Sequence, residues 1–161
     1  MRGVLALVLG MNENMLDEFH PVMALAEHIA ESVDPEIWAR FYHTPLPGKR
    51  AQSVLLYEGT EDHFNPYQTS EALACALNAT PVRPAVVRSV LSLGLKGIDP
   101  VDDTVSGNVA GGAATSALVQ FATTVASDGH FVYYAEPNAS TWADHFFSSG
   151  MSAQPAVVSK P

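Results

Sequence analysis

The chain has 161 residues, of which 47% are hydrophobic, so it is long enough to form a globular domain with its own core. Its 17 acidic and 8 basic residues give a formal net charge of −9, with no basic patch, which argues against a nucleic acid or an anionic membrane surface as a partner. A single cysteine, Cys75, rules out an intrachain disulfide and leaves the localisation open.

The first fifty residues are expected to be mainly helical. The apolar stretch over residues 1–11 is too short to span a bilayer, and the acidic residues that follow it, without a cleavage motif, favour an internal element over an export signal. Residues 5–16 are expected to be helical. Residues 21–29 carry their apolar side chains on one stripe, which predicts an amphipathic helix. Asp34 suits the N-cap of the next helix and Pro35 its first position.

Two prolines and a glycine between Thr44 and Arg50 predict a loop, which separates this helical part from the rest of the chain. We therefore divide the chain into a helical segment, residues 1–50, and an α/β portion, residues 51–161. No apolar stretch of the sequence is long enough to form a membrane-spanning helix, so no membrane span is expected.

The best-defined stretch runs from Gln52 to Leu77. Residues 53–57 form a short apolar run that ends at a glycine, which is typical of a buried strand. A polar turn over residues 61–66 follows, and a helix is expected to begin at Tyr67 or Gln68. A carboxylate therefore follows a buried strand, at the edge where open α/β sheets place their working residues.

The remainder is expected to supply further strands and a closing helix. Residues 86–95 contain three valines and are interpreted as a strand or a short extended pairing, and residues 97–112 as a long surface loop or hairpin. Residues 113–125 are expected to form the last strand, residues 127–131 a turn, and residues 138–149 a terminal helix. Alternating strands and helices of this kind predict the α/β class.

The segments LLYEGTEDHFNP (residues 55–66) and SDGHF (residues 127–131) carry a resemblance to a known family. The first resembles the acid loop, and the second the histidine loop, of the α/β-hydrolase superfamily of esterases, lipases and peptidase-like enzymes. In that family the catalytic triad runs nucleophile, acid, histidine along the chain. The resemblance covers about the C-terminal half of such a domain, from about Leu16 to the end.

By this resemblance Asp62 matches the triad acid and His130 the triad base, in an enzyme that hydrolyses a carboxylic ester or related acyl bond without a cofactor. The helices of residues 1–50 resemble cap or sheet-flanking segments. If they form a cap, Phe19, Trp38 and Phe41 would line an apolar pocket; ordinary helix packing explains them equally well. Phe131 is expected to anchor the histidine loop in the core.

The family's nucleophile elbow, G-x-S-x-G, is absent from the sequence. The nearest match, Val90–Gly94, lacks the first glycine and follows the acid, and Gly111–Gly112 has no preceding histidine to form an oxyanion segment. The chain is therefore interpreted as the C-terminal part of an α/β-hydrolase, inactive alone, and its cut sheet is expected to join an N-terminal fragment or another copy. The alternative is a degenerate, non-catalytic module that binds a protein partner or an apolar ligand.

Several other polar residues compete for a role. Glu61 and Asp128 are rivals for the acid, although Asp128 lies so close to His130 that shaping the turn suits it better. The sequence leaves open whether Glu58 is buried or faces the crevice. The remaining histidines have no metal-binding spacing, so no metal site is expected and surface or capping roles are favoured. Trp142 and Phe146 are expected to pack the last helix onto the sheet.

Overall fold

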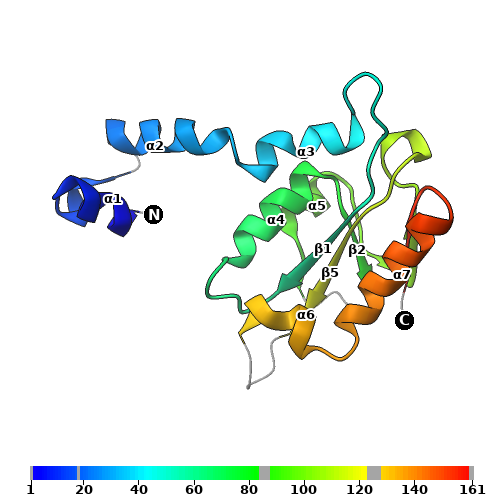
Figure 1. Cartoon of the computed structure of the whole chain (residues 1–161). Helices are drawn as coiled ribbons and strands as arrows, with labels where there is room; N and C mark the ends of the chain where they lie inside the picture. Colours follow the sequence, from blue (N-terminus) through cyan, green and yellow to red (C-terminus); the bar gives the residue numbers. More distant parts are fainter. Residues whose placement is uncertain (1, 18, 84–87, 123–127, 160–161) are drawn as a thin grey trace. The chain divides into compact units, whose positions relative to one another are not determined.

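The computed structural model describes residues 2–17, 19–83, 88–122 and 128–159 (Figure 1). The chain separates into two compact units, Met1–Ile37 and Trp38–Pro161, whereas the sequence suggested a boundary between residues 50 and 51. Each unit is described separately below.

The first unit is helical, as expected. It contains α1 (Arg2–Leu9), the 3-10 helix η1 (Glu13–Met15), α2 (Pro21–Glu31) and the start of α3 (Pro35–His43). The expected N-cap is present, because Asp34 Oδ1 accepts a hydrogen bond of 2.8 Å from the backbone N–H of Glu36. The apolar stripe of α2 is not buried, and Leu25 and Ile29 are both exposed.

The second unit is built on a four-stranded, fully parallel sheet in the order β1-β5-β2-β3. Its strands are β1 (Val54–Gly59), β5 (Ser116–Phe121), β2 (Thr80–Arg83) and β3 (Val101–Asp102). Every residue of β5 is buried, as expected for a central strand, whereas β1 is only partly buried and pairs with β5 alone among the described residues. This parallel sheet with helices agrees with the expected α/β class.

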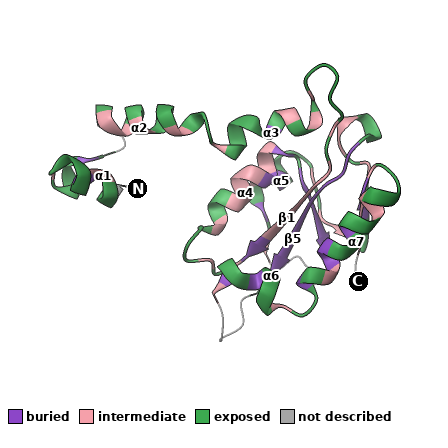
Figure 2. Ribbon diagram, viewed as in Figure 1, coloured by how far each residue is buried: buried purple, intermediate pink, exposed green. Residues whose placement is uncertain are grey.

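Helices cover both faces of the sheet (Figure 1). Side chains alternate along each strand, so that β5 directs Leu118 toward α4 (Tyr67–Ala76) and α5 (Leu91–Leu95). On the opposite face, Val119 packs with α6 (Val132–Ala135) and α7 (Ala139–Ser152), as expected for Trp142 and Phe146 of the terminal helix. Figure 2 shows this buried layer through the middle of the unit, with exposed helix surfaces outside it.

Parts of the segment between α4 and β5 differ from expectation. Residues 84–87 lie outside the described residues, and the second half of the expected strand over residues 86–95 is the helix α5 instead. Leucine favours helix, and the i, i+3 spacing of Val90 and Leu93 lets both contact the apolar layer. The expected loop after it contains β3, β4 (Thr104–Ser106) and the 3-10 helix η2 (Ala110–Gly112).

A further strand near the C-terminus was not expected. This strand, β6 (Val157–Ser159), pairs antiparallel with β4 to form a separate two-stranded sheet. Val105 and Val158 are opposite each other in this pairing, and both are buried in the core beneath α7. Three-residue strands give too little periodicity to be recognised in a sequence. Among the described residues, no helix is long and apolar enough to cross a membrane.

Candidate functional site

Two loops meet at the carboxyl ends of the neighbouring strands β1 and β5. The first loop, residues 60–66, connects β1 to α4, and the second contains the 3-10 helix η3 (Gly129–Phe131). The backbone N–H of Gly129 donates a hydrogen bond of 3.0 Å to the carbonyl of Glu61. Asp62 and His130, 68 positions apart in the sequence, are thereby brought to the same edge of the sheet.

Two glycines allow this close approach. A Cβ atom on Gly59 would lie 2.1 Å from the carbonyl oxygen of Gly129, and a Cβ on Gly129 would lie 2.6 Å from the backbone nitrogen of Asp62. Both contacts are with backbone atoms, which cannot move aside as a flexible side chain can. Glycine is therefore required at both positions for the loops to meet as they do.

The Asp62 carboxylate is held firmly and is mostly buried, with 12% of its side chain exposed. Its Oδ1 atom accepts hydrogen bonds from the backbone N–H groups of Phe64, at 2.9 Å, and Asn65, at 2.7 Å. Its Oδ2 atom lies 3.1 Å from Nδ1 of His130. An ionised carboxylate only accepts hydrogen bonds, so Nδ1 of His130 carries the proton in this contact.

The His130 ring is fixed on one side and open on the other. The Asp62 contact occupies Nδ1, and the described residues provide no hydrogen-bond partner for Nε2; 46% of the side chain is exposed. Phe64 and Phe131 each lie with their ring centroids 5.2 Å from that of the imidazole. This arrangement leaves Nε2 able to exchange a proton with a bound molecule.

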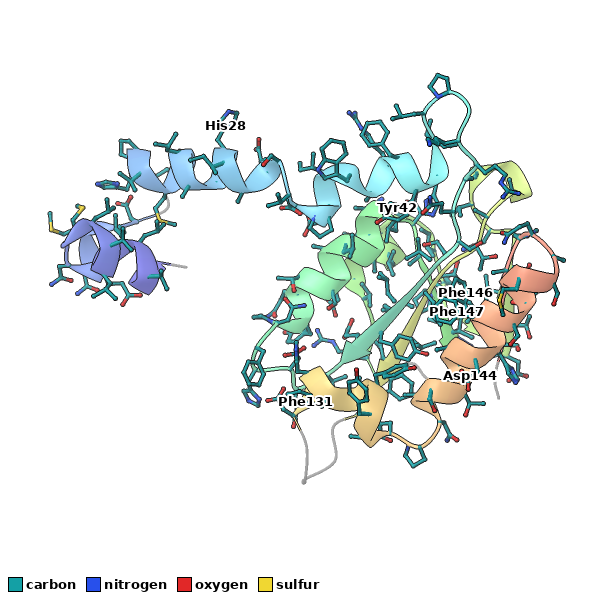
Figure 3. All side chains as sticks on the ribbon, in the orientation of Figure 1. His28, Tyr42, Phe131, Asp144, Phe146 and Phe147 are labelled. Carbon is teal, nitrogen blue, oxygen red and sulfur yellow. The ribbon has the colours of Figure 1, made fainter. Side chains whose placement is uncertain are left out.

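The expected anchoring role of Phe131 is wrong. Its side chain is 45% exposed and, in Figure 3, lies at the outer edge of the loop rather than in the core. Its ring packs against His130 and Phe64 instead. The chain turns at η3, and the neighbouring Val132 is the residue that enters the core. Phe131 therefore shields the imidazole instead of anchoring the loop.

A second acid–histidine pair crosses the first between the same two loops. Nδ1 of His63 lies 2.7 Å from Oδ2 of Asp128, while Oδ1 of Asp128 accepts from the backbone N–H of His130 at 2.9 Å. The hydrogen bond from the His130 backbone, followed by those from His63, lowers the pKa of Asp128. Asp128 thus shapes the turn, as its sequence position suggested, and its carboxylate pairs with His63 rather than with His130.

Glu58, whose position the sequence left open, is buried near the end of β1 with 1% of its surface exposed. Its Oε1 accepts a hydrogen bond of 3.1 Å from the side-chain amide of Gln120, its register partner on β5. Among the described residues Oε2 has no hydrogen-bond partner. The pKa of Glu58 is raised to about 7, chiefly by burial and also by the nearby Glu71 carboxylate, although the hydrogen bond from Gln120 and the charge of Arg88 oppose this shift.

The described residues provide no nucleophile for this site. None of the hydrogen bonds of the described residues joins the His130 ring to a serine, threonine or cysteine side chain, and Ser92 of the nearest elbow-like sequence lies in α5. Residues 123–127, just before the histidine loop, lie outside the described residues. No cluster of metal ligands occurs in the described part of the chain either. The site therefore consists of a held carboxylate and an imidazole with one accessible nitrogen.

The sequence pointed to Asp62 and His130 but missed two features around them. The pairing of His63 with Asp128 was not expected, although an aspartate and a histidine within three residues in both loops is a signal that could have suggested it. The burial of Glu58 could not be read from one strand.

In comparisons with protein family models, curated proteins and solved structures, no match to this chain was found.

Proposed function

We propose that Asp62 and His130 are the acid and base of a serine hydrolase that acts on carboxylic esters or related acyl bonds. The observation that carries this proposal is the 3.1 Å contact between Oδ2 of Asp62 and Nδ1 of His130. Two further points support the proposal. The pair lies at the carboxyl ends of adjacent parallel strands, and both loops resemble those of α/β-hydrolases.

In the proposed mechanism, Nε2 of His130 takes the proton of an attacking serine hydroxyl and later returns it to the leaving group. Asp62 keeps the proton on Nδ1, which leaves Nε2 as the acceptor, and its negative charge stabilises the imidazolium that forms. Two backbone N–H groups fix the Asp62 carboxylate, so it can hold the ring without rotating itself.

The serine and the oxyanion-stabilising groups are proposed to come from outside the described residues, from an N-terminal fragment of the same hydrolase. An acid–base pair without a nucleophile or an oxyanion hole supplies little of the rate enhancement. The chain alone is therefore expected to have no measurable esterase activity and to form no adduct with a fluorophosphonate.

Labelling of the purified chain, read by intact mass and peptide mapping, tests the source of the nucleophile. Absence of an adduct agrees with the proposal. A single labelled serine that is lost in His130→Ala would keep the hydrolase function but show that this chain carries its own nucleophile.

The acid–base pairing itself is tested by the tautomer of His130, measured from the ring nitrogen shifts in NMR spectra. We expect the Nδ1–H tautomer in the native chain at neutral pH and its loss in Asp62→Asn. Asp128→Asn is the matched control, since this carboxylate contacts the His63 ring and only the backbone of His130. An Nε2–H tautomer in the native chain would contradict the proposed roles and favour a non-catalytic module.

A further inference from the structure

A hollow of about 870 Å³ opens at the end of the second unit that lies away from the loops of Asp62 and His130. It is bordered by residues 49–53, which lead into β1, and by the last turns of α7 with the segment that follows. The candidate site lies instead at the carboxyl end of β1, so this hollow is separate from it. Its volume is in the range of about 300–1,000 Å³ that small-molecule sites occupy.

One side of the hollow is apolar. Phe146 forms part of the buried core, whereas the adjacent Phe147 and the nearby Met151 are 62% and 82% exposed. Figure 3 shows Phe146 and Phe147 side by side on α7. Small residues, including Gly150 and Ala156, also line the hollow, and a Cβ on Gly150 would lie 3.2 Å from the Cβ of Ala156. Long apolar side chains exposed around a hollow are typical of a binding surface.

The rim carries two cationic side chains, Lys49 and Arg50, which are the only charged residues that line the hollow among the described residues. A turn presents them, closed by a 3.0 Å hydrogen bond from the Lys49 backbone N–H to the carbonyl of Leu46, with Gly48 at a φ of 78°. In the described part of the chain neither side chain forms an ion pair. Two adjacent unpaired cations on a chain of net charge −9 form a local site for an anion.

The remaining polar side chains of the lining are largely occupied. Ser53 Oγ accepts a hydrogen bond from the backbone N–H of Thr115, and the Gln154 amide donates to the carbonyl of Gly150. The hollow therefore offers a cationic end and an apolar wall but few free groups for the repeated backbone hydrogen bonds that a peptide requires. A single anionic head with an apolar tail matches this pattern best.

We infer that this hollow binds a long-chain carboxylate, with its head at Lys49 and Arg50 and its hydrocarbon tail against Phe147 and Met151. This inference concerns a ligand site distinct from Asp62 and His130, and it does not depend on their proposed function. The bound carboxylate replaces water at both cations, while the tail covers apolar surface that is otherwise exposed.

The test is titration of the purified chain with dodecanoate below its critical micelle concentration. Binding is measured by calorimetry and by the NMR shifts of the backbone amides of residues 49–53 and 150–156. We expect saturable one-to-one binding, with weaker binding of hexanoate, which buries less tail. Dodecyltrimethylammonium has the same tail but a positive head, and the net charge of the chain would attract it. Equal binding of this cation would overturn the inference.

Variants separate the two parts of the site. Lys49→Gln with Arg50→Gln is expected to weaken dodecanoate binding about tenfold or more, because hydrogen bonds between charged groups are the strongest of their kind. The matched control is Arg40→Gln with Arg83→Gln, which removes the same charge away from the hollow. Met151→Ser should also weaken binding, whereas Leu95→Ser, at an equally exposed position on α5, should not.

Three results would contradict the inference. The first is the absence of dodecanoate binding, and the second is binding that none of the hollow variants changes. The third is a dimer of the ligand-free chain whose formation protects residues 49–53 and 150–156, since a second copy would then be the occupant. Light scattering during the titration detects a dimer, and the position of the protected amides shows whether the hollow forms its interface.

Discussion

At the scale of single residues, the burial of Glu58 constrains the charge of its side chain. Its carboxyl group is almost fully enclosed, faces Glu71 as well as Arg88, and has its pKa raised to about 7. An ionised carboxylate in this position loses hydration that Gln120 replaces only in part. The neutral form is therefore favoured in the folded chain.

This predicts a stability that depends on pH. The pKa of Glu58 in the folded chain, about 7, lies above its ordinary value of 4.5. Between these two pH values the folded state therefore binds more protons than the unfolded state, so Glu58 contributes stability that is lost as the pH rises through about 7. The difference corresponds to at most about 3 kcal/mol. Glu58→Gln should remove this part of the pH dependence, as measured by urea unfolding at pH 5 and pH 8.

The control for this experiment is Glu61→Gln, because Glu61 is exposed and lies only three positions away. It should leave the difference in unfolding free energy between the two pH values unchanged. If Glu58→Gln and the native chain lose the same stability between pH 5 and pH 8, Glu58 is not the group responsible.

At the scale of elements, the contact between the two loops depends on Gly129. Gly129→Ala would place a Cβ 2.6 Å from the Asp62 backbone nitrogen, so the loops must separate. We expect a destabilisation of about 1–3 kcal/mol, typical of overpacking, together with loss of the Nδ1–H tautomer of His130. Gly94→Ala is the control, since nothing lies near its Cβ position in α5. An unchanged tautomer in Gly129→Ala would show that the loops adjust without losing the pair.

The packing of α7 on the sheet gives a second prediction at this scale. Phe146 is 8% exposed within the core cluster, whereas the adjacent Phe147 is 62% exposed. Phe146→Ala should lower the free energy of unfolding by about 3–5 kcal/mol, since it removes a buried aromatic ring. Phe147→Ala should lower the free energy of unfolding far less, because its ring is mostly exposed. Denaturant unfolding of the two variants measures the difference, and equal losses would mean that α7 does not dock through Phe146.

At the scale of the whole molecule, the edge of the sheet at β1 is where we expect chains to meet. β1 pairs with β5 on one side and, among the described residues, has no strand on the other. Such an edge presents unpaired backbone groups that can pair with another chain. The net charge of −9 opposes association but is spread over the chain and is screened by salt.

We therefore expect the chain to self-associate at β1 or to bind an N-terminal fragment there. Light scattering as a function of concentration measures the association, and hydrogen exchange locates it, because alternate amides of β1 that point away from β5 should become protected. A chain that remains monomeric at all concentrations, with these amides exchanging rapidly, would contradict the prediction.

The local sequence determines the elements with strong signals. The apolar run before Gly59 predicts β1, Asp34 and Pro35 predict the start of α3, and the spacing of Trp142 and Phe146 predicts the packed face of α7. Weak signals mislead: the valines near residue 90 suggest a strand, yet the buried Leu93 belongs to a helix because tertiary contacts outweigh β propensity.

The sequence by itself made Asp62 and His130 candidates for chemistry, since each follows an apolar run in a polar turn and the two turns resemble loops of α/β-hydrolases. Only the tertiary structure decided that β1 and β5 are neighbours, so that these residues pair across 68 positions while His63 pairs with Asp128. It also decided that Glu58 is buried and that Phe131 is not. Strand order and register bring distant residues together, and neither is encoded in local periodicity.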